Sequence, residues 1–427
     1  MKGINIIGHI NGKFGLGKAL RLNIKALEKT SIPFIVYDYK KISDINLKEL
    51  EYSFNFIQIS LHEVNELVSS LSPDFFENKY NILYLVWESE IVPEKHHLTI
   101  NLFDEIWTAS SYCKAIFSKF FIGEITVVPH PVEISINDNF NENILDIYDE
   151  EKLSFLFVFD FNSSALRKNS YFLVDVFKKA SVKVNHKIEL ILKTSNSHHH
   201  KKDYQKLIQV VGETENIKIL DKHIDRNELN QLINKCDCYI SLHHSEGFGL
   251  TLAEAMAHGK PVIGTNYSGN TEFMNDKNSF LVDTIIQSVE SIDNHFDENT
   301  IWGNPIENSC IDKIIEVFSN KEIAIQKGNL AKQNIEDQLS YLNIGKIIEK
   351  RCNDISENMA HFNAFQRKIN FIRNQYLKTL VEFNSNQIEL KKIKNAQLRR
   401  VKKNILIRFI VILKNKTRKL KRKTLRN

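Results

Sequence analysis

Short runs of apolar and β-branched residues alternate with helical patterns along most of this chain, and each run has the length of a buried β-strand. One series comprises Ile4–Ile7, Phe34–Tyr37, Phe56–Ile59, Ile82–Val86 and Ile125–Val128. A second series comprises Leu153–Phe159, Ile188–Leu192, Ile217–Leu220, Cys238–Leu242 and Pro261–Gly264. Strands that alternate with helices in this way form parallel sheets covered by helices. The pattern therefore predicts an α/β protein.

The two series of strands predict two Rossmann-like domains, at residues 1–145 and 150–325. Between them lies a polar, acidic stretch without clear periodicity. A length of 427 residues agrees with this division, because single cores stop growing at about 250–300 residues. Residues 326–355 are predicted to form closing helices, and residues 356–427 a helical extension. Trp302–Pro305 is predicted to be a turn that leads into the last helices.

The C-terminal extension differs from the rest of the chain in charge. Residues 391–427 hold 16 Lys or Arg and no Asp or Glu, so removing these charges from the net charge of +5 leaves −11 on residues 1–390. Before that tail, apolar residues recur at helical spacing and predict a helix that packs on the body or pairs with another helix. They are Phe362, Phe365, Ile369, Ile372, Tyr376, Leu380 and Phe383.

The basic tail 391–427 is predicted to bind an anionic membrane surface. Residues 404–413 are mostly apolar, but this run is too short to span a bilayer. An apolar helix followed by a polybasic end suits an anionic membrane surface. A solvated tail and RNA binding are the alternatives, and nucleic acid is unlikely because no aromatic stacking platform accompanies the charge. The chain starts with a strand-like pattern rather than a signal peptide, so we expect a cytoplasmic protein, peripheral on the inner face of the membrane.

The first candidate for ligand chemistry is the glycine-rich loop Gly8–Ala19, between the first predicted strand and a helix. Gly12, Gly17 and Lys18 have the spacing of a P-loop, but Ala19 stands where a Ser or Thr would bind Mg²⁺. The third glycine of a dinucleotide fingerprint is also missing. The loop is therefore predicted to meet a diphosphate through its backbone, and a turn that merely needs glycines is the alternative.

The second candidate is the segment that follows the predicted strand Cys238–Leu242. Glu246, a Gly-Phe-Gly turn and a helix come in succession, and Glu254 lies early in that helix. Ligands of parallel sheets bind at the carboxyl ends of the strands, and a helix N-terminus attracts phosphate. Two carboxylates placed there can accept hydrogen bonds from paired hydroxyls of a sugar or a ribose. Thr251 and Glu254 also form a T-x-x-E capping box, but Glu246 and the turn favour ligand binding.

The residues around these glutamates resemble those of the family-4 retaining glycosyltransferases, which have the GT-B fold and an E-x7-E signature. The matching segments include Ser241–Leu250, Ala253–Ala257, Gly259–Ile263, Arg167–Asn169 and Val127–Pro131, and the resemblance covers roughly residues 1–350. It implies two Rossmann-like domains that face a cleft, with the closing helices crossing back to the first domain. The acceptor would bind mainly to the first domain, residues 1–145, and the nucleotide sugar mainly to the second, residues 150–325. The implied reaction moves a hexose from a nucleoside diphosphate sugar with retention of configuration.

Matched position by position, the resemblance implies a donor site. Glu246 would contact the transferred sugar, Glu254 would contact the ribose, and Lys168 would neutralise the diphosphate leaving group. Gly15 and Gly17 would close over the phosphates from the first domain. Backbone amides for the diphosphate and the sugar would come from Gly247, Phe248, Gly249 and Leu250.

Three positions depart from the common pattern of the family. The second phosphate cation is either Arg167 or missing, because the Gly-Arg that many members carry upstream of the lysine is absent. Glu88 stands where many members carry a His-Asp pair and is the candidate contact for the sugar or the acceptor. His244, assigned to the donor, stands where close relatives often carry Arg. No D-x-D pair occurs in the chain, so the predicted enzyme needs no metal and no cofactor besides its nucleotide-sugar co-substrate.

Together with the basic tail, the resemblance implies an acceptor that is a glycan or is lipid-linked, as in the synthesis of cell-surface polysaccharide or lipopolysaccharide. Two other functions stay open. One is a GT-B epimerase or hydrolase of sugar nucleotides, and the other is an inactive glycosyltransferase-like scaffold at the membrane. The intact Glu246, Glu254 and Lys168 argue against the scaffold.

Overall fold

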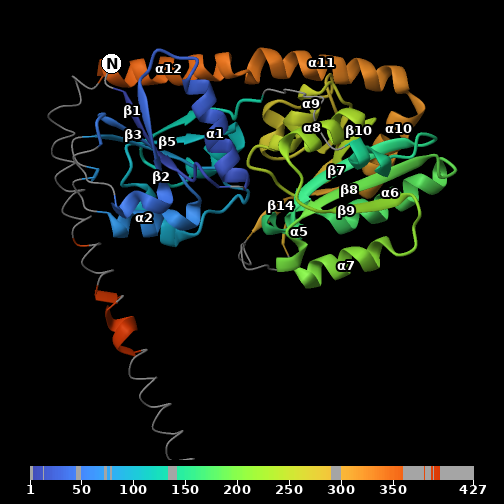
Figure 1. Cartoon of the computed structure of the whole chain (residues 1–427), viewed down its shortest axis with the longest axis horizontal. Coiled ribbons are helices and arrows are strands. Elements are labelled where there is room, and N and C mark those ends of the chain that lie inside the picture. Colours follow the sequence, from blue (N-terminus) through green and yellow to red (C-terminus); the bar gives the residue numbers. More distant parts are fainter. Residues whose placement is uncertain are drawn as a thin grey trace, which may run out of the picture. The chain divides into compact units, whose positions relative to one another are not determined.

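The computed structural model describes residues 3–12, 14–44, 50–71, 75–76, 79–132, 142–289, 300–358, 379, 386–387 and 389–394. The chain forms two compact units, and the first, residues 1–64 and 78–362, holds every described strand (Figure 1). The second comprises residues 65–77 and 363–427, and its described residues from 379 onward are helical. The predicted apolar stripe 362–383 and basic tail 391–427 therefore lie almost wholly outside the described residues. None of the helices that are described is long and apolar enough to cross a membrane.

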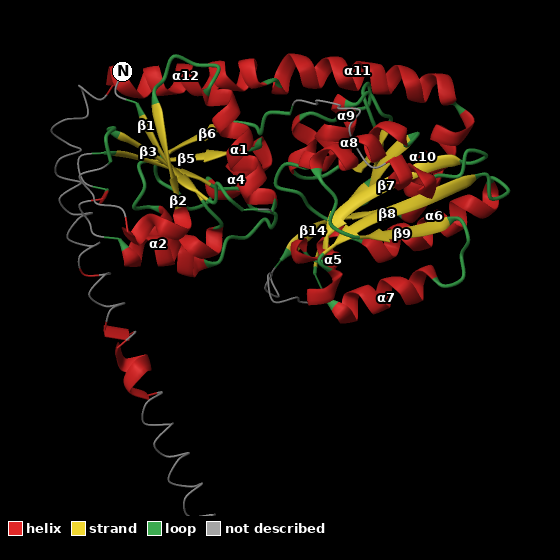
Figure 2. Ribbon diagram, in the orientation of Figure 1, coloured by secondary structure: helices red, strands yellow, loops and turns green. Residues whose placement is uncertain are grey.

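The first sheet has six parallel strands in the order β2-β1-β3-β4-β5-β6 (Figure 2). These strands are β1 Ile4–Gly8, β2 Phe34–Asp38, β3 Phe54–Gln58, β4 Tyr80–Tyr84, β5 Glu105–Thr108 and β6 Glu124–Val127. The helices between them in sequence are α1 Gly15–Leu27, α2 Val64–Ser70, α3 His97–Ile100 and α4 Ser111–Phe117. Strands β1 and β3, inside the sheet, are buried at every position and are mostly apolar. The buried Asn5 and Asn55 interrupt the apolar runs and are hydrogen-bonded to each other.

The second sheet also has six parallel strands, in the order β12-β11-β10-β7-β8-β9. These strands are β7 Leu153–Asp160, β8 Ile188–Ser195, β9 Ile217–Asp221, β10 Cys238–Ser241, β11 Val262–Thr265 and β12 Phe280–Val282. The helices between them in sequence are α5 Ala165–Lys168, α6 Ser170–Lys183, α7 Lys201–Val211, α8 Arg226–Lys235 and α9 Leu250–Ala257. All the predicted strands are confirmed, while the domain limits 1–145 and 150–325 stay a prediction.

A third, two-stranded antiparallel ribbon corrects one prediction. It pairs β13 (Thr284–Ser288) with β14 (Ile301–Pro305), with Gln287 opposite Trp302. The predicted turn at Trp302–Pro305 is therefore wrong, because this segment is a strand. Its Gly, Asn and Pro have turn-forming propensity, but pairing with β13 and burial of the Trp302 side chain outweigh that local preference.

Three helices end the first unit: α10 Glu307–Ser319, α11 Lys321–Leu339 and α12 Tyr341–Asn358. α11 packs against α9, and α12 packs against α1 of the first sheet. A Cβ atom on Gly345 would lie 2.6 Å from the Ala26 carbonyl oxygen, so a glycine lets α12 and α1 approach closely. Arg351 adds a paired contact, because its Nε and Nη2 lie 2.8 and 3.0 Å from the two carboxylate oxygens of the buried Glu105 in β5.

Replacing Arg351 by Met should lower the free energy of unfolding by about 3 kcal/mol, because the buried Glu105 carboxylate then lacks its ion partner. Urea denaturation at pH 7, followed by circular dichroism, measures the change. Lys350→Met, at the exposed neighbouring position of α12, is the matched control and should cost less than about 0.5 kcal/mol. Equal transitions for the two variants would show that the Arg351–Glu105 pair does not stabilise this contact.

Candidate functional site

The candidate site lies where two neighbouring strands of the second sheet end. β7 ends at Asp160 and is followed by α5, which carries Arg167 and Lys168. β10 ends at Ser241, and the loop that carries Glu246 leads from it into α9. Because β7 and β10 are paired in the sheet, these two loops leave the same edge side by side. This is the edge at which ligands of open parallel sheets bind.

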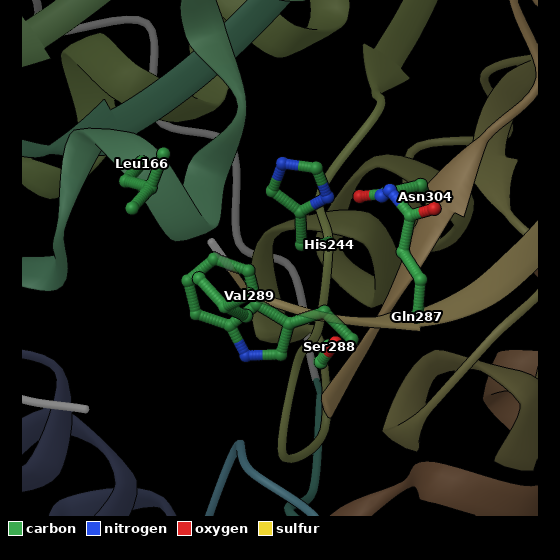
Figure 3. Close-up of a pocket in the computed structure, with 7 residues that line it drawn as sticks. Leu166, His244, Gln287, Ser288, Val289 and Asn304 are labelled. Atoms are coloured by element: carbon green, nitrogen blue, oxygen red, sulfur yellow. The ribbon is translucent and has the colours of Figure 1, made fainter. Parts of the chain in front are cut away.

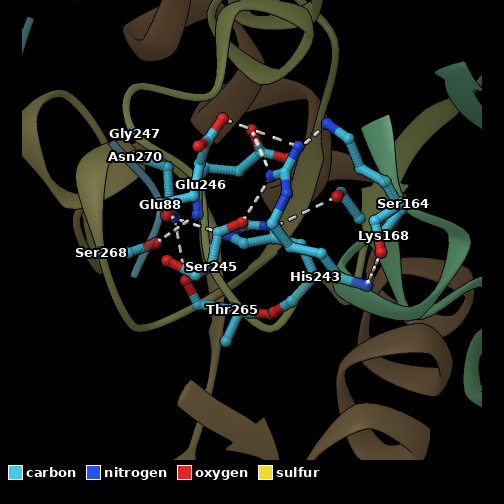
Figure 4. Close-up of polar contacts among 12 residues, drawn as sticks. Glu88, Ser164, Lys168, His243, Ser245, Glu246, Gly247, Thr265, Ser268 and Asn270 are labelled. Atoms are coloured by element: carbon cyan, nitrogen blue, oxygen red, sulfur yellow. Dashed lines mark hydrogen bonds and ion pairs between the residues drawn. The ribbon is translucent and has the colours of Figure 1, made fainter. Parts of the chain in front are cut away.

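Glu246 is the centre of a buried ion network (Figure 4). Lys168 Nζ lies 2.5 Å from Glu246 Oε1, and Arg167 Nη1 lies 3.3 Å from Glu246 Oε2. Arg167 Nη2 also lies 3.8 Å from Oε1 of Glu88, which follows β4 of the first sheet. The side chains of Arg167, Lys168 and Glu246 are only 6, 12 and 11% exposed. Four of the residues singled out in the sequence thus meet in one place.

The two cations keep Glu246 ionised. Burial alone would raise the pKa of Glu246, but the charges of Lys168 and Arg167 outweigh it and lower the pKa to about 2. Burial lowers the pKa of Lys168, and the neighbouring Glu246 carboxylate opposes that effect. At neutral pH Glu246 is therefore a hydrogen-bond acceptor, and it has no proton to give as a general acid.

The short helix α5 places the side chains of Arg167 and Lys168 next to Glu246. Ser164 and Asn169, which flank it, both have positive φ angles, of 64° and 56°, which non-glycine residues seldom adopt. Ser164 Oγ accepts a hydrogen bond from the Arg167 backbone N–H, and Asn169 Nδ2 donates to the Leu242 carbonyl at 2.9 Å. Arg167 Nη1 donates to the carbonyl of Ser245 at 2.7 Å. These bonds fasten α5 to the loop that carries Glu246.

Glycines next to Glu246 in the structure let neighbouring backbone segments approach closely. A Cβ atom on Gly269 would lie 2.2 Å from the Gly247 carbonyl oxygen, and one on Gly247 would lie 2.1 Å from Val86 Cγ1. The Glu246 N–H donates to Ser268 Oγ at 2.8 Å, and its carbonyl accepts from the Gly269 N–H at 2.8 Å. The backbone around Glu246 is consequently fixed from several sides.

The helix α9 begins at Leu250, four residues after Glu246. Its N-cap residue, Gly249, has a φ of 89° and makes no side-chain cap. The ring of Phe248 is buried against His130 and Phe273, at 5.3 and 5.1 Å between ring centroids, so this residue offers a ligand only its backbone. An uncapped helix N-terminus carries unsatisfied amides and a partial positive charge, which attract phosphate.

The alternative role of Glu254 as a capping residue is wrong, because its carboxylate pairs with two cations instead. Lys18 Nζ of α1 and Arg226 Nη2 of α8 both contact Oε1 of Glu254, the latter at 2.8 Å. Glu254 is 1% exposed, and its Oε2 has no hydrogen-bond partner among the described residues. Burial raises the pKa of Glu254, but Lys18 and Arg226 outweigh it and lower the pKa to about 2.

Lys18 and Arg226 are site residues that the sequence did not reveal. In the sequence, only the P-loop spacing singles out Lys18. Nothing in the sequence around Arg226, at the start of α8, indicates a ligand. Lys18 belongs to the glycine-rich segment and lies in the first turn of α1, next to Gly17, where a Cβ atom would lie 2.4 Å from the Gly12 carbonyl oxygen. Gly15, the first residue of α1, has open space around it. The predicted loop thus adjoins Glu254 through Lys18.

The two glutamates occupy separate ion clusters that are close to each other. Burial raises the pKa of Tyr239, and the charges of both Glu246 and Glu254 raise it further, so both carboxylates lie within electrostatic reach of one phenol.

His244, also assigned to the donor, stacks on Trp302 with ring centroids 5.2 Å apart. Burial lowers the pKa of His244 to about 4, so its ring is neutral at pH 7. Whether the enzyme works without metal stays a prediction.

Part of the chain matches a known family. Residues 147–298 match the sequence model of the family described as glycosyl transferases group 1. Trehalose synthase of Thermococcus litoralis is 25% identical over 176 residues, which make up 40% of this chain and 37% of that protein. The chain thus spans little more than a third of the length of this relative. The family and the relative indicate the class of enzyme that the sequence predicts, a glycosyltransferase.

Two solved structures resemble the chain over most of its length. HepE of Anabaena, in complex with UDP and glucose, has a TM-score of 0.61 at 14% identity, and the match covers 83% of this chain and 100% of that one. Sucrose-phosphate synthase of Thermosynechococcus elongatus has a TM-score of 0.62 at 12% identity, with 84 and 100% covered. At such identities the likeness shows the fold alone. It confirms the predicted fold class, two Rossmann-like domains of the GT-B type.

The Glu254 cluster should make stability depend on acid pH. The pKa of Glu254 is depressed from 4.5 to about 2, so its contribution is full above pH 4.5 and is lost as the pH falls toward 2. Glu254→Gln should therefore destabilise the protein at pH 7, and the gap to the wild type should shrink by about 1 kcal/mol at pH 3.5. Urea titrations at the two pH values measure this gap.

The exposed carboxylate Glu213, changed to Gln, is the control and should show no gap at either pH. A gap for Glu254→Gln that is equal at pH 7 and pH 3.5 would contradict the ion pairing of Glu254.

Proposed function

We propose that this chain is a retaining glycosyltransferase of family 4, with Glu246 and Glu254 as its E-x7-E pair. The observation that carries the proposal is the buried contact of 2.5 Å between Lys168 and Glu246, at the ligand-binding edge of the second sheet. The group 1 family match over residues 147–298 supports the enzyme class. HepE, a neighbour in fold that binds UDP and glucose, supports a nucleoside diphosphate sugar as the donor.

In this proposal the cations and amides stabilise the leaving group. When the bond between the anomeric carbon and the phosphate oxygen breaks, its electron pair stays on the diphosphate, which becomes more negative. Lys168 contacts Glu246, and the uncapped N-terminus of α9 follows Glu246 closely in the sequence, so both can share that charge. They supply the positive charge for which other enzymes use a metal, so the proposed reaction is metal-independent.

Glu246 and Glu254 hold the donor through its hydroxyls. Both are ionised at neutral pH, so both accept hydrogen bonds and neither protonates the leaving group. Glu246 would accept from a hydroxyl of the transferred sugar, and the unpaired Oε2 of Glu254 would accept from the ribose. For Arg167 we propose a role other than phosphate binding, because its guanidinium lies between the carboxylates of Glu246 and Glu88. We assign to it the alignment of these two carboxylates.

Retention follows if the acceptor hydroxyl attacks the anomeric carbon from the face that the diphosphate leaves. The new bond then forms on the same face as the broken one, and the hydroxyl proton passes to the departing phosphate oxygen. No protein nucleophile takes part in this step. The proposed acceptor is a glycan or a lipid-linked glycan of cell-surface polysaccharide, such as lipopolysaccharide, and the carboxylate of Glu88 is the proposed contact for it.

Lys168→Met should lower kcat by about 10²–10³-fold, because it removes a donor that stabilises the leaving group. Glu246→Gln should also lower activity, since the amide no longer holds the lysine. Release of nucleoside diphosphate from the donor sugar measures turnover, and thermal unfolding checks that each variant is folded. Lys202→Met, at an exposed position of α7, is the matched control. Unchanged turnover in the Lys168 variant would refute the proposed site, and rapid release of free sugar without an acceptor would indicate a hydrolase.

We also propose that the tail 391–427 holds a cytoplasmic enzyme on the inner face of the membrane. The support is its charge, 16 basic and no acidic residues. Each basic residue near an anionic surface contributes about 1 kcal/mol, so a few contacts are enough for attachment.

Deleting residues 391–427 should release the protein from anionic vesicles at moderate salt, as measured by co-sedimentation. Neutral vesicles are the control, and they should bind neither form. If the truncated protein binds anionic vesicles as well as the full chain does, the tail is not the membrane contact.

A further inference from the structure

A pocket of about 210 Å³ lies beside the ion network, next to the β13–β14 ribbon (Figure 3). This volume is below the range of about 300–1,000 Å³ for drug-sized ligands. The pocket is therefore small and suits a single small ring rather than a larger ligand. The residues that line it include Leu166, His244, Gln287, Ser288, Trp302 and Asn304.

The ribbon is fastened to the loop of the candidate site, so the walls of this pocket are preformed. The Gly303 N–H donates to the carbonyl of His244 at 3.2 Å, and His244 Nδ1 lies 3.2 Å from the Gly303 carbonyl oxygen. The rings of His244 and Trp302 stack at an interplanar angle of 13°. A Cβ atom on Gly303 would lie 2.6 Å from the Tyr267 ring, so the ribbon also fits closely at its back.

The chemistry of the lining favours a neutral ligand that is both polar and apolar. Two side-chain amides, of Gln287 and Asn304, and the hydroxyl of Ser288 offer donors and acceptors. The side chain of Leu166 and the small exposed part of the mostly buried Trp302 indole offer apolar surface. Neither a lysine, an arginine nor a carboxylate lines the described pocket, and His244 is uncharged at neutral pH. A sugar ring combines hydroxyls with apolar C–H faces, whereas a phosphate would find no cation here.

We infer that this pocket is a subsite for a neutral sugar unit of the acceptor. The inference rests on the proposed glycosyltransferase function. His244, which the resemblance assigns to the donor, lines the pocket together with Leu166. The two residues stand next to the network in sequence, two residues before Glu246 and one before Arg167. The proposed donor contacts instead follow Glu246 in the sequence, from the N-terminus of α9 to Glu254. An acceptor whose hydroxyl reaches the sugar at Glu246 can therefore place its next unit in the pocket.

Saturation-transfer NMR tests this subsite with glucose, galactose, mannose and N-acetylglucosamine as probes. Each is titrated into the full chain in the presence of UDP or GDP, whichever raises the melting temperature. At least one monosaccharide should bind, and Asn304→Ala and Gln287→Ala should each weaken it at least about fivefold, the loss of about 1 kcal/mol for one hydrogen bond. The affinity for the nucleotide should stay the same in both variants.

Gln205→Ala, an exposed amide of α7, is the matched control and should bind like the wild type. As a further variant, Trp302→Phe replaces the indole in the pocket wall by a smaller ring and should also bind the monosaccharide more weakly. Equal affinity in the Asn304, Gln287 and wild-type proteins would overturn the inference, as would binding of no monosaccharide. Competition between the monosaccharide and a nucleotide sugar would assign the pocket to the donor instead. If neither UDP nor GDP binds, the proposed donor fails, and the monosaccharide titration still tests the pocket.

Discussion

The burial of the Glu246 carboxylate is the constraint on which the site depends. A carboxylate in a nearly closed environment is costly unless cations pair with it, and here Lys168 and Arg167 do so on different oxygens. That pairing requires the left-handed residues that flank α5 and the close approach of Gly247 and Gly269. It also requires two paired strands to end side by side. A network of this kind adds little net stability, so its presence is better explained by chemistry than by folding.

The two glutamates have different surroundings, and this difference supports different tasks. Glu246 has a cation on each oxygen, and both cations come from α5. Glu254 has Lys18 and Arg226 on one oxygen, while the other oxygen is buried without a partner among the described residues. Lys18 belongs to α1 of the first sheet, so the Glu254 cluster joins that helix to α8 and α9 of the second sheet. The arrangement suits a donor whose sugar lies at Glu246 and whose nucleotide lies at Glu254.

Local sequence predicted the parts of this structure that depend on local pattern. Most buried strands appear as apolar runs, and Glu246 lies in a motif that follows a predicted strand. Lys168 was assigned only through the resemblance to the family-4 glycosyltransferases. The β13–β14 ribbon was missed because its pairing joins segments that carry no strand pattern by themselves. The capping box at Thr251 was misleading, because Gly249 takes the N-cap and Glu254 has stronger ionic partners. Lys18 and Arg226 could not be found, since their role arises only when distant segments meet.

The central claim is that the site at Glu246 and Glu254 binds a nucleoside diphosphate sugar. Thermal unfolding of the full chain against a panel of nucleoside diphosphates and their sugars tests it most directly. A ligand at 100 times its dissociation constant adds about 2.7 kcal/mol to the free energy of unfolding. The account predicts that at least one nucleoside diphosphate, and its sugar, raises the melting temperature by several degrees. No stabilisation by any member of the panel at millimolar concentration would contradict it.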